Sequence, residues 1–252
     1  MDTGVQRRIL ITGGATGIGR TTALLAAQRG YAVAINFAHS DRAARDLVWQ
    51  IEAMGQVALA IKADIAEEEE VVRMFETMDR ELGPINALVN NAAHIDRQMR
   101  LDEMSGARLE KTFSINVIGA FLCAREAIRR MSTRHRGTGG AIVNVSSGAA
   151  RCGSPGEYID YASSKGAIET MTLGLAREVA VENIRVNAVR PGFIDTGLHA
   201  KTGEPNRVQR VGHLVPMKRV GTPQEVAHAI LWLASSEASY VTGAIVDVSG
   251  GR

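Results

Sequence analysis

Short apolar runs alternate with longer amphipathic segments along the whole chain. The apolar runs are rich in Val, Ile and Ala, and several are nearly continuous, which is typical of strands covered on both faces. They predict strands at Arg8–Ile11, Tyr31–Phe37, Val57–Lys62, Asn86–Val89, Ala141–Val145, Arg185–Val189 and Ala244–Val248. The segments between them predict helices at about 17–29, 41–54, 67–82, 105–135, 160–182 and 222–235.

Regular alternation of strands and helices predicts right-handed βαβ units and a parallel sheet. No linker, repeat or low-complexity block divides the chain. We therefore expect an α/β fold over residues 1–252, as a single doubly wound Rossmann domain with a seven-stranded parallel sheet and helices on both faces. Ligands of such sheets bind beyond the carboxyl ends of the strands, so the loops that follow the strands are where candidate chemistry belongs.

Composition narrows the class of protein without choosing an activity. The 252 residues include 26 Gly and 6 Pro, and 45% are hydrophobic, which excludes collagen-like and disordered chains. A net charge of +2 gives no reason to expect nucleic acid or an anionic membrane as a partner. The two cysteines, Cys123 and Cys152, form no metal-binding or disulfide pattern, so no metal site is expected. Without an apolar signal segment or membrane-spanning run, the sequence predicts a cytoplasmic location.

Two runs of like charge fit the ends of predicted helices. Glu67–Glu70 open one helix, where negative side chains complement the positive end of the helix dipole. Arginines gather near the end of the long helix, where positive charge is favoured, at Arg125, Arg129, Arg130, Arg134 and Arg136. We interpret both runs as solvated surface, with docking of an acidic partner as the alternative for the arginines.

The first predicted strand runs directly into a glycine-rich turn, Thr12-Gly13-Gly14-Ala15-Thr16-Gly17-Ile18-Gly19, and a helix follows. Glycines allow unusual backbone angles and close approach of a pyrophosphate, and a helix N-terminus attracts the anion. The spacing differs from the common G-x-G-x-x-G, but its place between strand and helix fits a dinucleotide site. The residues expected around the pyrophosphate are Gly13, Thr16, Gly17, Ile18 and Gly19.

The end of the second strand bears on which cofactor binds. An acidic residue about 20 positions after the glycines would hold a ribose hydroxyl and favour NAD. The stretch from residue 34 to 40 has none, and Asp41 is better placed to open the next helix. Asn36, His39 and Ser40, with Arg20 or Arg42 nearby, are instead suited to a 2′-phosphate. We predict NADP as the cofactor, with NAD possible.

Tyr161 and Lys165 are four residues apart, and therefore on one face of a predicted helix. A free tyrosine titrates near 10, so acid/base work at pH 7 needs a large shift, and a nearby cation lowers the pKa of a phenol. Such a pair is common on helix surfaces. Its place after a strand that ends at Ser146-Ser147 favours a catalytic role here.

These motifs together resemble the short-chain dehydrogenase/reductase family from Arg7 to Gly251. The glycine turn resembles the family's cofactor loop, and Asp64-Ile65 its adenine-contacting pair. Asn90-Asn91-Ala92-Ala93 is similar to its Asn-Asn-Ala-Gly strand end, with Ala for the final Gly. Further similarities are the tetrad Asn116, Ser147, Tyr161 and Lys165, the loop Pro191-Gly192-Phe193-Ile194-Asp195-Thr196, and the close from Val241-Thr242-Gly243 to Ser249-Gly250-Gly251.

The resemblance implies a role for each of these residues. Tyr161 would exchange a proton with a carbonyl or secondary alcohol, Lys165 would lower the Tyr161 pKa and hold the nicotinamide ribose, and Ser147 would hydrogen-bond the reacting oxygen. Asn116 would hold a water of a proton relay. Neighbouring Tyr158 and Ser146 do not fit the family pattern. The further implied cofactor contacts are Asp64, Ile65, Asn91, Ala92, Ala93, Pro191, Gly192, Ile194 and Thr196.

The substrate is not determined by the sequence. The family keeps a substrate lid near residues 197–215, where this chain carries His199, Lys201, Arg207, Arg210 and His213, read either as attraction for an anion or as a solvated loop. The resemblance extends to 3-oxoacyl-carrier-protein reductases and glucose dehydrogenases. A generic carbonyl reductase, these two activities and a non-enzymatic cofactor-binding sensor therefore remain as alternatives. Family members usually form homotetramers through the long fourth and fifth helices, and we expect the same assembly.

Overall fold

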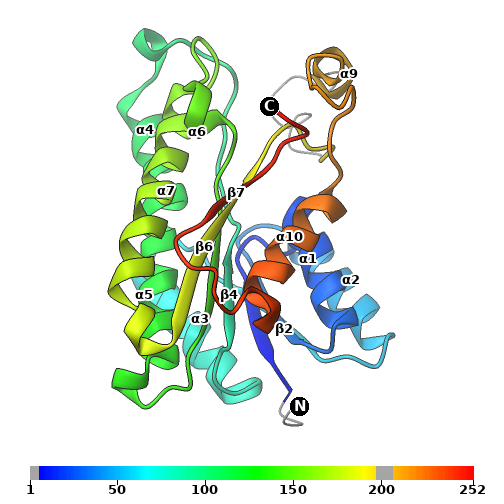
Figure 1. The fold of residues 1–252 in the computed structure, drawn as a ribbon, viewed down its shortest axis with the longest axis vertical. Helices are drawn as coiled ribbons and strands as arrows, with labels where there is room; N and C mark the ends of the chain where they lie inside the picture. The colour runs from blue at the N-terminus through cyan, green and yellow to red at the C-terminus, as the bar shows by residue number, and fades with distance from the viewer. Residues whose placement is uncertain (1–5, 197–206) are drawn as a thin grey trace.

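The computed structural model describes residues 6–196 and 207–252. Within this part of the chain, seven strands form one parallel sheet in the order β3-β2-β1-β4-β5-β6-β7, so the predicted fold class is confirmed (Figure 1). The strands are β1 (Arg8–Ile11), β2 (Ala32–Phe37), β3 (Ala58–Lys62), β4 (Ala87–Asn90), β5 (Gly140–Val145), β6 (Ile184–Pro191) and β7 (Ile245–Val248).

The helices lie close to the predicted ranges. The main ones are α1 (Gly17–Gln28), α2 (Asp41–Glu52), α3 (Glu68–Glu81), α4 (Gly106–Phe113), α5 (Gly119–Met131), α7 (Ile159–Glu178) and α10 (Pro223–Ala234). Two shorter helices are α6 (Ala149–Cys152) and α9 (Arg207–Gly212). Single 3-10 turns occur at Leu101–Glu103, Thr133–His135, Ala180–Glu182 and Ser236–Ala238.

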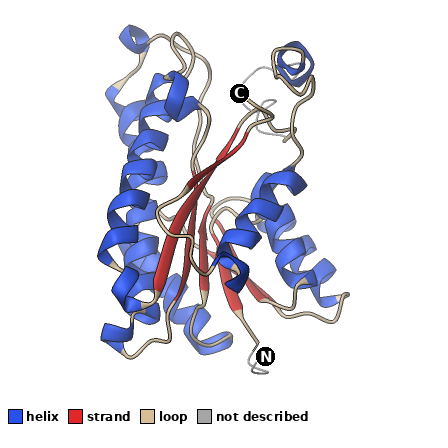
Figure 2. Ribbon diagram, in the orientation of Figure 1, coloured by secondary structure: helices blue, strands red, loops and turns tan. Residues whose placement is uncertain are grey.

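Alternate residues of the strands belong to two hydrophobic cores, one on each face of the sheet. In β1, Ile9 and Ile11 pack with apolar residues of α1, α2 and α10, whereas Leu10 between them packs with residues of α3, α5 and α7. All three β1 side chains are fully buried. Figure 2 shows the resulting three layers, with helices on both sides of the strands. Burial on both faces explains why the strands read as continuous apolar runs.

The predicted single helix over 105–135 is wrong in one respect, because a π-helical turn at Ser114–Ile118 separates α4 from α5. Such turns often lie at functional sites, and this one contains Asn116. Just beyond it, α5 packs closely on the chain after β3: a Cβ on Gly119 would lie 2.7 Å from the Ile65 carbonyl oxygen.

The strand order reverses between β1 and β4, which are neighbours in the sheet although β2 and β3 intervene in sequence. This switch point is where doubly wound sheets bind ligands. The glycine turn after β1 and the Asn91-Ala92-Ala93 segment after β4 both begin there. Of the predicted lid, residues 197–206, with His199 and Lys201, lie outside the described residues. In the described parts of the chain, we find no helix that is both long and apolar enough to cross a membrane.

Candidate active site

The glycine turn between β1 and α1 has the backbone shape expected of an anion-binding loop. Gly13 and Gly17 adopt φ angles of +60° and +55°, which favour glycine. A Cβ on Gly19 would lie 2.5 Å from the Gly13 carbonyl oxygen, so the turn closes tightly on the start of α1. Thr16 at the N-cap makes no side-chain cap hydrogen bond. The first N–H groups of α1 therefore lack that partner and suit a phosphate.

Hydrogen bonds join the glycine turn to the residues that follow β4. The Asn91 amide donates to the carbonyl oxygens of Thr12 at 2.9 Å and Gly13 at 3.1 Å. In return, the Thr12 hydroxyl accepts from the backbone N–H groups of Asn91 and Ala92, both at 3.0 Å. Asn91 thus holds the turn through its side chain, while the partly buried Ala92 and exposed Ala93 continue past it.

The structure corrects the expected role of Asn36. Its side chain is buried, and its two polar atoms are engaged: Oδ1 accepts from the Gly13 N–H at 3.3 Å and Nδ2 donates to the Ala63 carbonyl oxygen at 2.9 Å. Asn36 therefore positions the glycine turn instead of pointing toward a 2′-phosphate. An unpaired amide at the end of a buried strand would have cost free energy, which is the physical reason for this inward placement.

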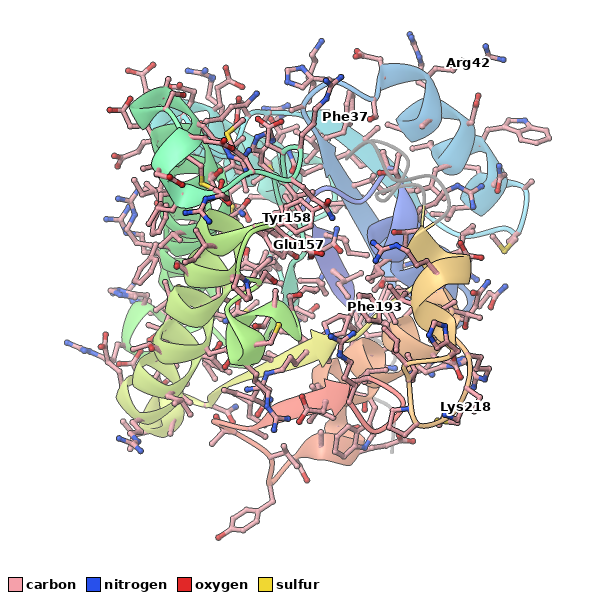
Figure 3. All side chains as sticks on the ribbon, turned by 90° about the horizontal axis from the view of Figure 1, so that it is seen from above. Phe37, Arg42, Glu157, Tyr158, Phe193 and Lys218 are labelled. Atoms are coloured by element: carbon pink, nitrogen blue, oxygen red, sulfur yellow. The ribbon has the colours of Figure 1, made fainter. Side chains whose placement is uncertain are left out.

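The other residues predicted to lie near the adenosine part of the cofactor are more exposed to solvent. His39 is exposed and Ser40 is partly exposed at the start of α2. Arg20 donates to the Gln50 side chain at 2.7 Å. The Arg42 side chain is 95% exposed in the first turn of α2 (Figure 3). On the other side of β2, the Asp64 carboxylate accepts from Ala66 N–H at 3.0 Å and Ile65 is buried.

Tyr161 and Lys165 lie together near the start of α7, as predicted. The Lys165 ammonium is 5.7 Å from the centre of the Tyr161 ring and donates to the Val145 carbonyl oxygen at 2.7 Å. Since Val145 ends β5, this bond fixes Lys165 against the strand that leads into Ser147. Ser147 is partly buried, and its hydroxyl accepts from Ala149 N–H at 3.2 Å.

Burial perturbs both titrating groups of the pair. It lowers the pKa of Lys165 to about 8. It also raises the pKa of Tyr161, and a hydrogen bond with Ser147 opposes this rise. Desolvation of the phenol outweighs the Ser147 hydrogen bond, and the lowering of the Tyr161 pKa by Lys165 stays a prediction.

Asn116 is buried in the π-helical turn and binds the backbone of the segment after β4. Its amide donates to the His94 carbonyl oxygen at 2.9 Å and its Oδ1 accepts from the His94 N–H at 2.6 Å. The amide also donates to the Ser164 hydroxyl at 3.0 Å, and Ser164 in turn donates to the Tyr161 carbonyl oxygen at 2.7 Å. Asn116 therefore connects the β4 exit with α7, while its part in a proton relay stays a prediction.

Ser146 is buried, and its hydroxyl lies within hydrogen-bonding distance of the Lys165 carbonyl oxygen, at 3.3 Å. Its hydroxyl donates to Glu169 at 2.7 Å, and Glu169 forms a two-pronged ion pair with Arg190 of β6, each contact 2.8 Å long. Arg190 also binds Asp247 of β7 at 2.8 Å. This network braces β5, β6, β7 and α7 behind Ser147. The choice of Ser147 over Ser146 stays a prediction.

The loop after β6 reaches back toward the glycine turn. Gly148 N–H donates to the Pro191 carbonyl oxygen at 2.8 Å, and a Cβ on Gly192 would lie 2.8 Å from Ser249 Cα. Ile194 is buried. A Cβ on Gly17 would lie 3.8 Å from the Thr196 methyl group. The loops after β1, β4, β5 and β6 thus meet at one end of the sheet, and Phe193 marks this end in Figure 3.

The residues present fit a nicotinamide dinucleotide. The glycine turn leaves no room for Cβ atoms at Gly13, Gly14 or Gly19, and the start of α1 presents N–H groups without a side-chain cap. Gly13, Thr16, Gly17, Ile18 and Gly19 would hold the pyrophosphate, and Tyr161 and Lys165 the far ribose. Residues 6–196 and 207–252 contain no group of three His, Cys, Asp or Glu side chains that could bind a metal ion.

Sequence reasoning missed a buried ion pair between Arg108 of α4 and Asp160, the residue before Tyr161. The Arg108 Nε lies 2.8 Å from Asp160 Oδ2, and the two side chains are 7% and 1% exposed. Burial would raise the pKa of Asp160, but the Arg108 hydrogen bond holds it below its ordinary value. No sequence pattern joins two positions so far apart, although an acid directly before Tyr161 is a visible signal.

Known proteins are similar to this chain over nearly its whole length. The family model described as enoyl-(acyl carrier protein) reductase matches residues 13–252. The chain is 53% identical, over 96% of its length and 98% of the relative's, to a protein of Escherichia coli named uncharacterized oxidoreductase YgfF. It is 36% identical to the 3-oxoacyl-[acyl-carrier-protein] reductase FabG of Staphylococcus aureus, over 98% of each chain.

A solved structure is similar over nearly the whole chain. It is a short-chain type dehydrogenase/reductase from Mycobacterium marinum, with 34% sequence identity and a TM-score of 0.91. The match covers 97% of this chain and 94% of that one.

Lys165→Met should be more stable than the wild type at pH 7. The difference in their free energies of unfolding should shrink as the pH rises. A lowering of the Lys165 pKa from 10.5 to about 8 corresponds to a cost of about 3 kcal/mol for the buried ammonium. Both folded and unfolded states carry the charge below pH 8. The folded wild type loses its proton first as pH rises, so the cost fades toward pH 10.5. Denaturant unfolding of both proteins from pH 7 to 10 measures the difference.

The substitution of exposed Lys111 by Met is a control for removing one lysine. A stability difference between wild type and Lys165→Met that stays constant or widens with pH would contradict this account of Lys165.

Proposed function

Since the chain belongs to the short-chain dehydrogenase/reductase family, we propose that it is an NADP-dependent oxidoreductase acting on a carbonyl or secondary alcohol, with Tyr161 as the general acid and base. The family membership makes it an NAD(P)-dependent dehydrogenase/reductase. The observation that carries the finer proposal is the Tyr161–Lys165–Ser147 cluster at the end of the sheet where the glycine turn begins. When bound there, the nicotinamide ring supplies or accepts the hydride.

Tyr161 would transfer a proton to the carbonyl oxygen in reduction and accept it from the alcohol in oxidation. Ser147, whose hydrogen bond opposes the rise of the Tyr161 pKa, would donate to the same oxygen as negative charge develops on it. Lys165 is fixed by Val145 and would add positive charge beside the phenol. Burial raises the pKa of Tyr161, so the phenol keeps its proton at neutral pH and can act as the acid in reduction.

The proposal keeps two narrower activities of the same family as alternatives. One is reduction of a 3-oxoacyl group on a carrier protein, which is the activity in the printed name of the Staphylococcus relative. The other is dehydrogenation of a sugar. Docking of an acidic carrier on the arginines between Arg125 and Arg136 loses support, because four of them are paired with acidic side chains. Arg125, Arg129 and Arg130 pair with Glu126, and Arg134 pairs with Glu182.

A homotetramer is part of the proposal, supported by an uncovered apolar groove between α5 and α7. Ile118, at the end of the π-helical turn, and Phe121 of α5 are 51% and 48% exposed. Leu122, Leu175 and Val179 line the groove with them. A second copy of the chain would cover these side chains. A cytoplasmic location is also proposed, since both cysteines are free thiols.

Tyr161→Phe should lower kcat about 10²- to 10⁴-fold in carbonyl reduction, because the variant lacks the proton donor. The affinity for the cofactor should change little. A panel of carbonyls and alcohols assayed with NADPH, NADH and their oxidised forms by nicotinamide absorbance provides the rates. Tyr158→Phe is the matched control, and loss of turnover in that variant instead of Tyr161→Phe would refute the assignment.

The wild type should have a higher kcat/KM with NADPH than with NADH. His39→Asp should reduce this preference about tenfold or more, because a carboxylate near a 2′-phosphate repels it. His228→Asp, at an exposed position of α10, makes the same charge change elsewhere and should leave the preference intact. A wild type equally active with NADH would remove the NADP part of the proposal.

Phe121→Glu should dissociate the tetramer into smaller species, because it places a charge in the apolar groove. Light scattering after size-exclusion chromatography measures the mass. Trp49→Glu is the control, since Trp49 is 70% exposed on α2, away from the groove. A Phe121→Glu protein with the same mass as the wild type would exclude this face as an interface.

A further inference from the structure

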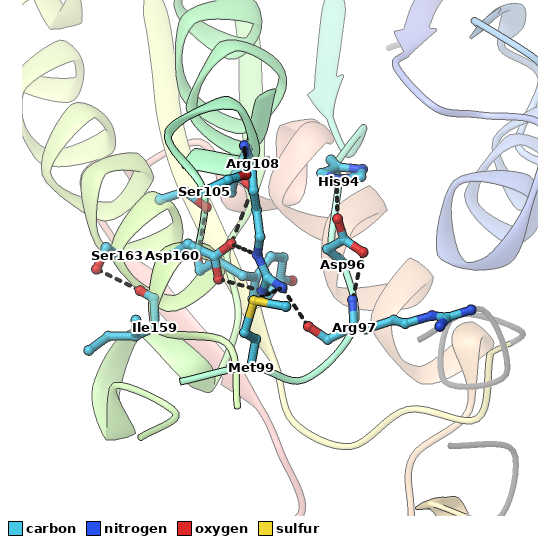
Figure 4. A network of polar contacts seen from close by, with 12 residues as sticks. His94, Asp96, Arg97, Met99, Ser105, Arg108, Ile159, Asp160 and Ser163 are labelled. Atoms are coloured by element: carbon cyan, nitrogen blue, oxygen red, sulfur yellow. Dashed lines mark hydrogen bonds and ion pairs between the residues drawn. The ribbon is translucent and has the colours of Figure 1, made fainter. Parts of the chain in front are cut away.

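Arg108 is a buried arginine whose guanidinium group binds two separate segments beside Tyr161. Its Nε and Nη2 atoms donate to the Asp160 carboxylate at 2.8 and 3.3 Å. Its Nη1 donates to the Arg97 carbonyl oxygen at 2.7 Å. Figure 4 shows the guanidinium between the Asp160 side chain on α7 and the backbone of Arg97. One side chain therefore joins α4, α7 and the segment that follows β4.

The segment from His94 to Arg100, here named the 94–100 loop, is held at both ends. His94 at its start binds Asn116 through both backbone polar groups. Near its other end, Met99 N–H donates to the Glu157 carbonyl oxygen at 3.0 Å, just before α7. Arg108 binds the loop between these two points. The loop follows the Ala92-Ala93 segment and leads from the candidate cofactor site along the start of α7.

The buried charges of Arg108 and Asp160 require well-placed hydrogen-bond partners. A buried ion pair is stable only when its donors and acceptors are satisfied, and removing one partner leaves an uncompensated charge. The Asp160 carboxylate also accepts from the Thr112 hydroxyl at 3.4 Å. Hydrogen bonding to Asp160 raises the pKa of Arg108, and Asp160 stays ionised, so both charges persist at neutral pH. The orientation of Asp160 is therefore fixed by α4.

We propose that Arg108 and Asp160 are positioning residues that fix the Tyr161 phenol and the 94–100 loop in one mutual arrangement. Asp160 directly precedes Tyr161 in the first turn of α7, so a rotation of that turn would move both residues. The guanidinium prevents such a rotation and keeps the 94–100 loop against α7. The loop would then form one wall for the substrate, at a fixed distance from the proton donor. This role rests on the proposed function of Tyr161.

Asp160→Asn tests the proposal, because the amide keeps the size of the side chain and removes its charge. We expect the kcat of carbonyl reduction to fall about 10- to 100-fold, the range that a small misplacement of a catalytic group produces. The Kd for NADPH should change less than about twofold, since the glycine turn is untouched. Hydrogen exchange of the Met99 amide should become at least about tenfold faster, as the loop is released.

Asp79→Asn is the matched control. Asp79 on α3 accepts from Arg130 of α5 at 2.6 Å, so its substitution weakens an ion pair outside the candidate site. This variant should keep the kcat and the Met99 exchange rate of the wild type. The double variant Arg108→Met/Asp160→Leu removes both charges, which proteins often tolerate without loss of stability. The double variant should still show fast Met99 exchange and a reduced kcat. The same effects in both variants would show that they do not come from misfolding of Asp160→Asn.

A folded Asp160→Asn or double variant with a kcat within about twofold of the wild type would overturn the proposal, even if Met99 exchange were faster. Unchanged Met99 exchange would overturn it as well. The pH titration of Tyr161 provides a readout independent of turnover. It is the part of the tyrosinate absorbance change that is lost in Tyr161→Phe. Its midpoint should shift in Asp160→Asn and stay unchanged in Asp79→Asn. A wild type without turnover would refute the proposed function, whereas an unshifted titration would refute the positioning role alone.

Discussion

The hydrogen bonds between Thr12 and Asn91 join the carboxyl ends of the two central strands, and the candidate site depends on this join. β1 carries the glycine turn and β4 carries the segment that leads to His94. The Asn91 amide and the Thr12 hydroxyl lock these two exits together through four contacts. Asn36 adds a tie from β2 to the same turn. The strand order alone brings the segments after β1 and β4 near each other. The side chains of Thr12, Asn91 and Asn36 fix the positions of these segments relative to one another.

The chain places polar and charged groups around the candidate site at a cost in stability. Lys165 is buried beside Tyr161, with the Val145 carbonyl oxygen accepting its hydrogen bond. Asn116 is buried in a π-helical turn that interrupts a long helix. The hydrophobic cores on both faces of the sheet compensate for these features. Local departures from the most stable arrangement are expected where function requires them.

The fold could be predicted because its signals are local. Buried strands such as Ala32–Phe37 and the amphipathic helices between them are visible in hydrophobic periodicity, and the positions of Tyr161 and Lys165 follow from helical spacing. The placement of Asn36 could not be predicted, because its partners Gly13 and Ala63 come from other segments. The Arg108–Asp160 pair and the π-helical turn likewise depend on tertiary contacts. Desolvation of the Tyr161 phenol is also a property of the packed structure.

The central claim is that this end of the sheet holds a nicotinamide cofactor against a carbonyl or alcohol carbon, next to Tyr161. Transfer of deuterium from NADPH labelled at C4 of the nicotinamide tests it most directly, with the alcohol products of a carbonyl panel analysed by mass spectrometry. Assays with cofactor labelled on either face of the ring cover both stereochemical possibilities. The account predicts one deuterium on the carbinol carbon from one labelled face and none from the other. Alcohol formed without deuterium from either face, or no alcohol from any carbonyl, would contradict it.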